Sequence, residues 1–277
     1  MKKLFSSKTV VKSVFFTLLA SVVYIAIRLI LAPSGASLPD QDVRVKSDYA
    51  LMLLQCGLGM VAMLLPGFLE RKMKIVIPSG MIVAFAIFLY CGVYLGEVHY
   101  FYFRVPHWDT LLHTFSGFAL GAVGLSIMGI LNKSESVPVS LSPAFISIFA
   151  FCFAVTVGVI WEIYEFTVDS IAGLNMQKYL LENGEMLIGR EALLDTMKDL
   201  IVDALGALAI SIIGYASMKN KEGWLENIQI RFNRPAPEPS PVYAIASHAI
   251  TSHAAHSQPA LAAAGKTVAP ESIGFAS

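Results

Sequence analysis

The stretch AFISIFAFCFAVTVGVIWEIYEF (residues 144–166) contains no charged residue before Glu162. A bilayer core is spanned by about 20 mostly apolar residues, so this run predicts a membrane helix. Its end carries Glu162 and Glu165, whose three-residue spacing places both carboxyls on one helix face. An ionisable group in a membrane helix costs several kcal/mol unless it faces other helices or water. The stretch therefore predicts a polar site at one end of a membrane helix.

The composition of the whole chain agrees with this prediction. Of its 277 residues, 56% are hydrophobic and 14% are charged, and the mean hydropathy is +0.64. These values are typical of a polytopic membrane protein, so we predict an all-α membrane helix bundle. We expect six transmembrane helices, at Val11–Ala32, Ala50–Leu69, Ile75–Leu95, Leu111–Leu131, Ser142–Phe166 and Leu200–Met218. The formal net charge of zero argues against a nucleic-acid partner.

The distribution of basic residues predicts the orientation, because cytoplasmic loops retain lysine and arginine. Basic residues gather before the first helix, in the loop after the second and after the last, at Lys2, Lys3, Lys8, Lys12, Arg71, Lys72, Lys74, Lys219 and Lys221. We therefore expect both termini in the cytoplasm.

Two further helices carry ionisable residues at one end. WDTLLHTFSGF (residues 108–118) contains Asp109 and His113, four residues apart. DTMKDLIVDALG (residues 195–206) contains Asp195, Asp199 and Asp203 at the same spacing, so each helix presents one polar stripe. With both termini inside, the polar ends of the last three helices all lie at the outer leaflet.

Carboxylates and one imidazole are ligands suited to Mg²⁺, Mn²⁺ or Ca²⁺ and, with the histidine, to iron or zinc. The candidate ligands of a divalent metal are Asp109, His113, Glu162, Glu165, Asp199 and Asp203. The candidate catalytic residues are His113, Glu162 and Asp203. Without a metal, crowded acids share protons and would act as a proton relay. Asp109 could also orient His113 as a general base.

Structural roles remain open for the same residues. Asp109 and Asp195 lie beside predicted helix starts, where acids cap free N–H groups. Glu165 and Asp169 could lie in the periplasm beyond the fifth helix, and the other acids could join helices through polar contacts. Gly117 and Gly121 form a GxxxG motif, which predicts close helix packing.

Two segments are too polar to span a membrane. Residues 167–196 are long enough to form a re-entrant or lid-like loop over the acidic cluster. After Arg234 the sequence RPAPEPSP begins a region rich in Pro, Ala and Ser, which cannot form a core. We therefore expect a six-helix transmembrane domain over residues 1–233 and a disordered cytoplasmic tail over residues 234–277.

WDTLLHTFSGFALG, WEIYEF and DTMKDLIVDALGAL, in this order, resemble the YjdF-like bacterial inner-membrane proteins, whose function is uncharacterised. This resemblance implies a multi-pass protein of a bacterial inner membrane. The chain is more distantly similar to the VanZ-like group, some members of which are linked to glycopeptide antibiotic resistance. The aspartate and the histidine four residues later in that group match Asp109 and His113, and its paired acids before a glycine match Asp199, Asp203 and Gly206. The lysine that often follows its aspartate is Thr110 here.

The leading functional hypothesis is a metal-dependent hydrolase or transferase that acts on a lipid-linked or envelope substrate. The alternatives are a proton- or cation-coupled transporter and a non-catalytic envelope factor in contact with membrane lipids. The other halves of two of these helices read GAVGLSIMGI and ALAISIIGYA, without an acidic residue, lysine, arginine or histidine. This favours a site at one membrane face over a path through the membrane, although the first three helices could supply Arg28 or Gln55 to such a path.

Overall fold

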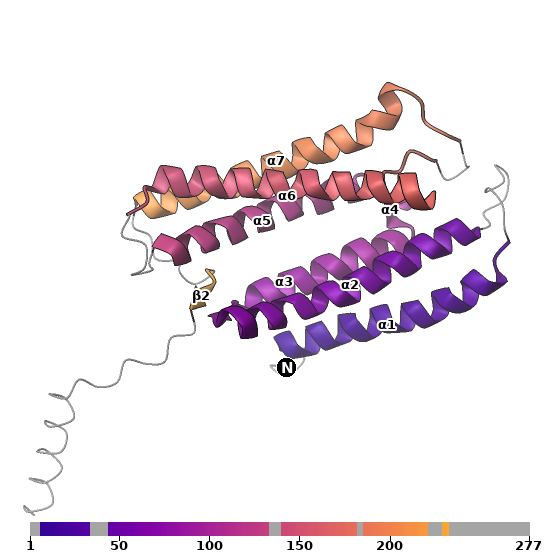
Figure 1. Ribbon diagram of the computed structural model, residues 1–277, viewed down its shortest axis with the longest axis horizontal. Helices are drawn as coiled ribbons and strands as arrows, with labels where there is room; N and C mark the ends of the chain where they lie inside the picture. The colour runs from indigo at the N-terminus through magenta and orange to yellow at the C-terminus, as the bar shows by residue number, and fades with distance from the viewer. Residues whose placement is uncertain (1–5, 34–43, 133–139, 182–184, 221–228, 233–277) are drawn as a thin grey trace, which may run out of the picture. The chain divides into compact units, whose positions relative to one another are not determined.

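The computed structural model describes residues 6–33, 44–132, 140–181, 185–220 and 229–232. Within these residues, six helical segments are long and apolar enough to cross a membrane (Figure 1). They are α1 (Ser7–Leu31), α2 (Lys46–Met73), α3 (Ser79–Leu89) with its continuation η1 (Tyr90–Val98), α5 (Trp108–Asn132), α6 (Pro143–Ala172) and α7 (Arg190–Lys219). The predicted all-α multi-pass fold is confirmed.

Several helix boundaries differ from those predicted. The third span begins at Ser79 rather than Ile75, because Ile75–Val76 form strand β1, which pairs antiparallel with β2 (Arg231–Phe232). The third span also ends as a π-helix, η1, before the short helix α4 (Phe101–Arg104). The last span begins at Arg190 rather than Leu200. The polar residues that precede its apolar run are helical too, which places Asp195 and Asp199 within α7.

Helices α1, α2 and α3 with η1 form the N-terminal bundle. Its buried core is apolar along the length of the helices, from Val14 and Met63 through Leu18 and Cys56 to Ile25. Many of its other large side chains are exposed, including Ile30, Leu31 and Val61. A membrane protein exposes such side chains to lipid tails, so these faces contact membrane lipids.

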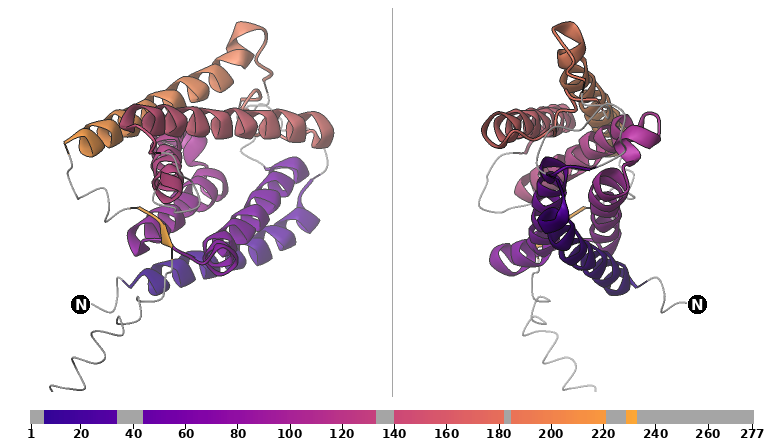
Figure 2. Two further views of the ribbon diagram at one scale, coloured as in Figure 1. Left: turned by 60° about the vertical axis from the view of Figure 1, so that its left-hand side comes forward. Right: turned by 90° about the vertical axis from the view of Figure 1, so that its right-hand side faces the viewer.

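Helices α5, α6 and α7 form the C-terminal bundle, whose crossing is visible from two sides in Figure 2. A Cβ atom on Gly117 would overlap the backbone carbonyl of Asp203, and one on Gly206 would overlap that of Thr114. The backbones of α5 and α7 can approach this closely only because both residues are glycine. The predicted close packing of α5 is confirmed.

We define the site end of the helices as the C-terminal ends of α1, η1 and α6 and the N-terminal ends of α2, α5 and α7. The apolar core of the C-terminal bundle lies in the half away from it, at Leu125, Met128, Ile146, Ala150 and Ile210. This half therefore packs mainly through apolar side chains, with the small residues Ser126, Ser147, Ser211 and Ser217 also buried there.

The segment after α6 is fixed to the helices at the site end. Gly173 has a left-handed backbone (φ +62°) and its amide donates to the carbonyl of Asp169 at 2.9 Å, which ends α6. The Asp169 carboxylate is buried and accepts hydrogen bonds from the amides of Met176 and Gln177, at 2.8 and 2.9 Å. Met176 in turn packs against Leu51 of α2. Asp169 thus shapes this loop rather than lying free in solvent.

The predicted boundary at residue 233, the disordered tail over residues 234–277 and the cytoplasmic location of the termini stay predictions. Residues 233–277 lie outside the described part of the chain, as do Lys2, Lys3 and Lys221.

Candidate functional site

Helices α5, α6 and α7 bring acidic residues and one histidine together at the site end. Asp109 and His113 lie on the first two turns of α5, and Asp199 and Asp203 face them from α7. Glu162 comes from the last part of α6. The side chains of Glu162, Asp199 and Asp203 are buried, with 3–5% of each residue exposed.

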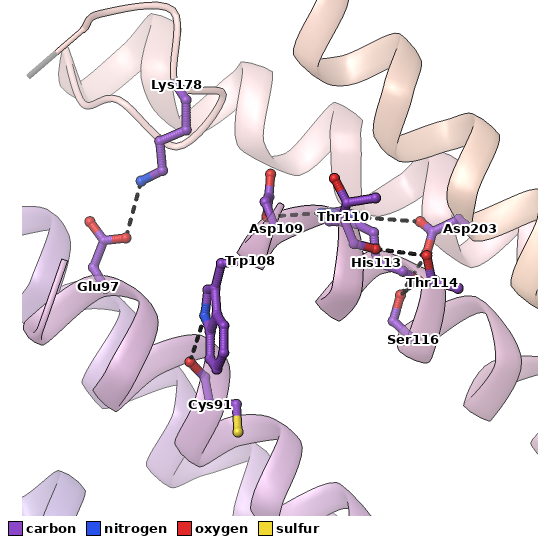
Figure 3. A network of polar contacts seen from close by, with 10 residues as sticks. All are labelled: Cys91, Glu97, Trp108, Asp109, Thr110, His113, Thr114, Ser116, Lys178 and Asp203. Atoms are coloured by element: carbon purple, nitrogen blue, oxygen red, sulfur yellow. Dashed lines mark hydrogen bonds and ion pairs between the residues drawn. The ribbon is translucent and has the colours of Figure 1, made fainter. Parts of the chain in front are cut away.

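The His113 imidazole lies between two carboxylates (Figure 3). Its Nδ1 is 3.2 Å from Asp203 Oδ2, and its Nε2 is 3.7 Å from Asp109 Oδ1. The Ser116 hydroxyl donates to the other oxygen of Asp203 at 2.6 Å. Asp203 is therefore held from both sides, and its contact fixes the ring orientation of His113.

Asp109, His113 and Asp199 form a group with the spacing of metal ligands. Each offers one ligand atom, and the three atoms lie within 4.8 Å of one another. Ligands about 2.1 Å from a common ion are about 3 Å apart at right angles and about 4 Å apart when opposite. Small side-chain rotations would thus bring the three donors to one divalent ion.

Two buried carboxylate oxygens have no hydrogen-bond partner in the described residues, namely Glu162 Oε1 and Asp199 Oδ1. A buried acceptor without a partner costs about 1–3 kcal/mol, and more when it is charged. A cation or a water molecule would supply the missing contact. The donor set and its unpartnered oxygens therefore fit a divalent metal.

Only three of the six predicted ligands belong to this group. Asp203 contacts His113 and Ser116 instead, so it acts on the geometry of His113. Glu162 and Glu165 lie outside the group, and Glu165 is partly buried. Asp195 is also partly buried, one turn before Asp199. The roles of all these residues as ligands or catalysts stay predictions.

Two hydroxyl residues extend the cluster beyond the predicted set. Ser116 is three residues after His113, so the helical spacing alone could have identified it. The Thr196 side chain interacts with the Glu162 carboxyl and accepts a hydrogen bond from Gln177 Nε2 at 3.0 Å. Through Gln177, Glu162 is connected to the loop that Asp169 organises.

A buried ion pair beside the cluster joins this loop to the N-terminal bundle. Lys178 Nζ is 3.1 Å from Glu97 Oε2, with 15% and 7% of the side chains exposed. The Lys178 ammonium also lies 4.9 Å from the centre of the Tyr102 ring. Burial lowers the pKa of Lys178, but the charge of Glu97 and its hydrogen bond outweigh this and raise it overall. No sequence pattern connects residues this far apart in the chain.

Tyr102 lies beside this ion pair and within the influence of the charges of the acidic cluster. Its ring packs so closely on Gly96 that a Cβ there would lie 2.5 Å from it. Burial, followed by the charges of Asp109 and Glu97, raises the pKa of the Tyr102 phenol well above its usual range. Tyr102 is therefore a neutral residue that can donate a proton in a hydrogen bond at the edge of the cluster.

The family of the chain follows from a comparison with known proteins. Residues 18–220 match the family described as "Predicted membrane protein (DUF2238)". The chain belongs to this family. The matched DUF2238 region begins within α1 and extends through α7, so it contains the whole acidic cluster.

One relative of this DUF2238 protein is an "Uncharacterized protein" of Thermotoga maritima. The two are 30% identical over 131 residues, which are 47% of this chain and 59% of the relative. The chain thus spans about three fifths of the length of that relative. No solved structure matches the chain.

Proposed function

We propose that Asp109, His113 and Asp199 bind a divalent metal and that the site belongs to a hydrolase or transferase acting on a lipid-linked or envelope substrate. The observation that carries this proposal is the convergence of three donor atoms within 4.8 Å beside the unpartnered Asp199 Oδ1. One nitrogen and two oxygen donors suit Zn²⁺, Mn²⁺ or Fe²⁺.

The contacts of His113 indicate a different role for each of its two ring nitrogens. Nε2 faces Asp109 and is the donor available to a metal. Nδ1 then carries the proton and donates to Asp203 Oδ2. Ser116 holds the opposite oxygen of Asp203. Asp203 is thus a positioning residue that raises the basicity of the imidazole.

Glu162 is the proposed general acid or base. Its Oε1 is buried and has no hydrogen-bond partner among the described residues, so it is ready to accept a proton from an attacking hydroxyl or water. A bound divalent metal would polarise the substrate's carbonyl or phosphoryl group. Asp109, with 22% of its side chain exposed, lies on the open side of the cluster, where a substrate could enter from the helix ends.

The proposal includes the orientation and the finer family assignment. Lys8, Lys12, Arg71, Lys72 and Lys219 all lie at the ends of helices away from the site end. By the positive-inside rule the helix ends that carry these basic residues are cytoplasmic. The site end then faces the outside of a bacterial inner membrane. The YjdF-like motifs lie within the matched region, which supports a YjdF-like and distantly VanZ-like assignment.

The first experiment measures metal content by elemental mass spectrometry in detergent-purified protein after incubation with Zn²⁺, Mn²⁺ or Mg²⁺. We expect close to one ion per chain in the wild type and none in Asp109→Asn/Asp199→Asn. Asp203→Asn should retain the site with an affinity lowered about 10- to 100-fold. Glu191→Gln is the control, because Glu191 is an exposed acid on the first turn of α7. Equal metal content in all variants would refute the proposed ligands.

Proton-coupled transport is the second candidate, because His113 lies between two carboxylates and could exchange a proton with either. The absence of any bound metal in the wild type, together with proton uptake by vesicles that Asp203→Asn abolishes, would favour it. Neither metal nor proton movement would leave a non-catalytic envelope factor.

A further inference from the structure

A second polar region lies in the N-terminal bundle, away from the acidic cluster. A cavity of about 900 Å³ opens between α1, the residue Arg44 before α2, η1 and α4. Its polar end contains Arg28, Arg44, His99 and Arg104. Its remaining wall includes Phe16 and other residues of α1. This volume is in the range of pockets that bind small molecules.

The three guanidinium groups come from separate segments and are held by neutral partners. Arg44 donates to the carbonyl of Val98 at 3.1 Å and lies 3.9 Å from the centre of the Tyr100 ring. Arg28 donates to the Tyr24 hydroxyl at 3.3 Å and lies over the Tyr49 ring. Within the described residues, none of the three forms an ion pair with a carboxylate.

Three cations that lack an acidic partner in the described part of the chain favour an anionic ligand. A guanidinium presents five N–H donors, and the recorded contacts use few of them. The unused donors favour a phosphate group as the ligand, because arginine binds phosphate with two parallel hydrogen bonds. A carboxylate of this chain does not take that place among the residues that the structure describes.

This cavity is elongated along α1, and we call it the arginine groove. Its length indicates the rest of the ligand. Arg28 lies within one turn of the end of α1, and Phe16 lies twelve residues earlier on the same helix. At 1.5 Å per residue, the groove extends about 18 Å along α1. One leaflet of the hydrocarbon core is about 15 Å thick. The groove is therefore cationic at the membrane boundary and runs to about the depth of one acyl chain.

We infer that this groove binds an anionic phospholipid, with its phosphate held by Arg28, Arg44 and Arg104 and one acyl chain along α1. A zwitterionic lipid brings its own ammonium and leaves the three arginines only partly neutralised. Inorganic phosphate has the charge but cannot use the wall of α1. This site is independent of the metal site, since it shares none of its residues.

The test is a titration of delipidated protein in detergent, followed by native mass spectrometry. The probes are phosphatidylglycerol and phosphatidylcholine with equal acyl chains. We expect the wild type to bind one phosphatidylglycerol at least about tenfold more tightly than phosphatidylcholine. Arg28→Gln/Arg104→Gln should lose that preference. Both residues are exposed, so the change should leave the fold intact.

The matched control is Arg71→Gln/Lys72→Gln, which removes two exposed cations at the other end of α2. It should bind phosphatidylglycerol as the wild type does. A wild type without preference, or a double arginine variant that keeps it, would overturn the inference. Displacement of the lipid by millimolar inorganic phosphate would also overturn it in favour of a soluble phosphate ligand. Unchanged metal content in the arginine variants would show that the two sites are separate.

Discussion

The N-terminal and C-terminal bundles each contain three membrane-length segments, but they bury different chemistry. The core of α1, α2 and α3 with η1 is apolar along its length, and its only buried carboxylate in the described residues is Glu97. The C-terminal bundle confines its apolar core to one half and buries Glu162, Asp199 and Asp203 in the other. The N-terminal bundle therefore has a mainly apolar interior, whereas one half of the C-terminal bundle has a polar interior whose side chains are fixed by their contacts.

The close approach of α5 and α7 explains how the second arrangement holds together. Gly117 and Gly206 allow backbone contact at the level of Asp203. At this level the Asp203 carboxylate contacts both His113 and Ser116 of α5. Helix packing and the polar site are therefore one structural feature in this bundle, whereas the described core of the N-terminal bundle contains no comparable group of carboxylates.

The largest expected effect comes from separating α5 and α7. Gly206→Leu would place a side chain against the carbonyl of Thr114, which cannot move without shifting α5. We expect a loss of more than about 4 kcal/mol, seen as little folded protein in fluorescence-detected size-exclusion chromatography. Gly57→Leu in α2 is the control, because no atom lies within 4 Å of a Cβ there. Equal losses from both changes would contradict the comparison.

Breaking the ion pair between the bundles should cost somewhat less. Lys178→Met leaves the buried Glu97 without its partner, and we expect a loss of about 3 kcal/mol in unfolding free energy. Glu97→Leu/Lys178→Met removes both charges and should recover most of that loss. The measurement is a denaturant titration in detergent. A double variant no more stable than Lys178→Met would show that the unpaired Glu97 carboxylate is not the cause of the loss.

The same pair predicts a dependence on alkaline pH. The folded pKa of Lys178 is raised above its ordinary value of 10.5. A raised pKa contributes stability that is complete below the unfolded pKa and is lost as the pH rises through the folded pKa. Between pH 7 and 9, the titration of Lys178 should therefore leave the melting temperature unchanged. Above the ordinary value, the wild type should lose more stability than Glu97→Leu/Lys178→Met.

Two aspartates provide a smaller, paired test. Asp169→Ala removes hydrogen bonds to two loop amides, whereas Asp48→Ala removes one to the amide of Val45 at the start of α2. We expect a loss of about 2 kcal/mol for the first and about 1 kcal/mol for the second. Thermal unfolding in one detergent compares them directly. Equal losses would mean that the loop after α6 is no more tightly held than an ordinary helix cap.

The smallest effect concerns a contact between the bundles. Trp108 Nε1 donates to the carbonyl of Cys91 at 3.3 Å. Trp108→Phe keeps the ring and removes the donor, so we expect a loss of about 1 kcal/mol. Trp161→Phe is the control, since 45% of Trp161 is exposed. A loss confined to Trp161→Phe would place the important contact elsewhere.

Local patterns predicted the six spans and brought Asp109, His113, Asp199 and Asp203 to one place, because four-residue spacing fixes a helix face. They could not divide these residues into a three-donor group and a supporting Asp203, since that depends on the rotation of α7 against α5. The Lys178–Glu97 ion pair could not be predicted from the sequence either, because it joins residues 81 positions apart. The start of α7 was wrong because hydropathy detects the apolar part of a helix and not its polar first turns.

The π-helix η1 makes the length of the chain itself a constraint. One side of η1 supports Tyr102 at Gly96, another holds Glu97 for Lys178, and a third turns Tyr94 and Val98 toward the arginine groove. Deleting one residue would rotate everything before it by roughly a quarter turn relative to everything after it. Related chains should therefore align without gaps from Leu89 to His99, however much the amino acids between them have diverged.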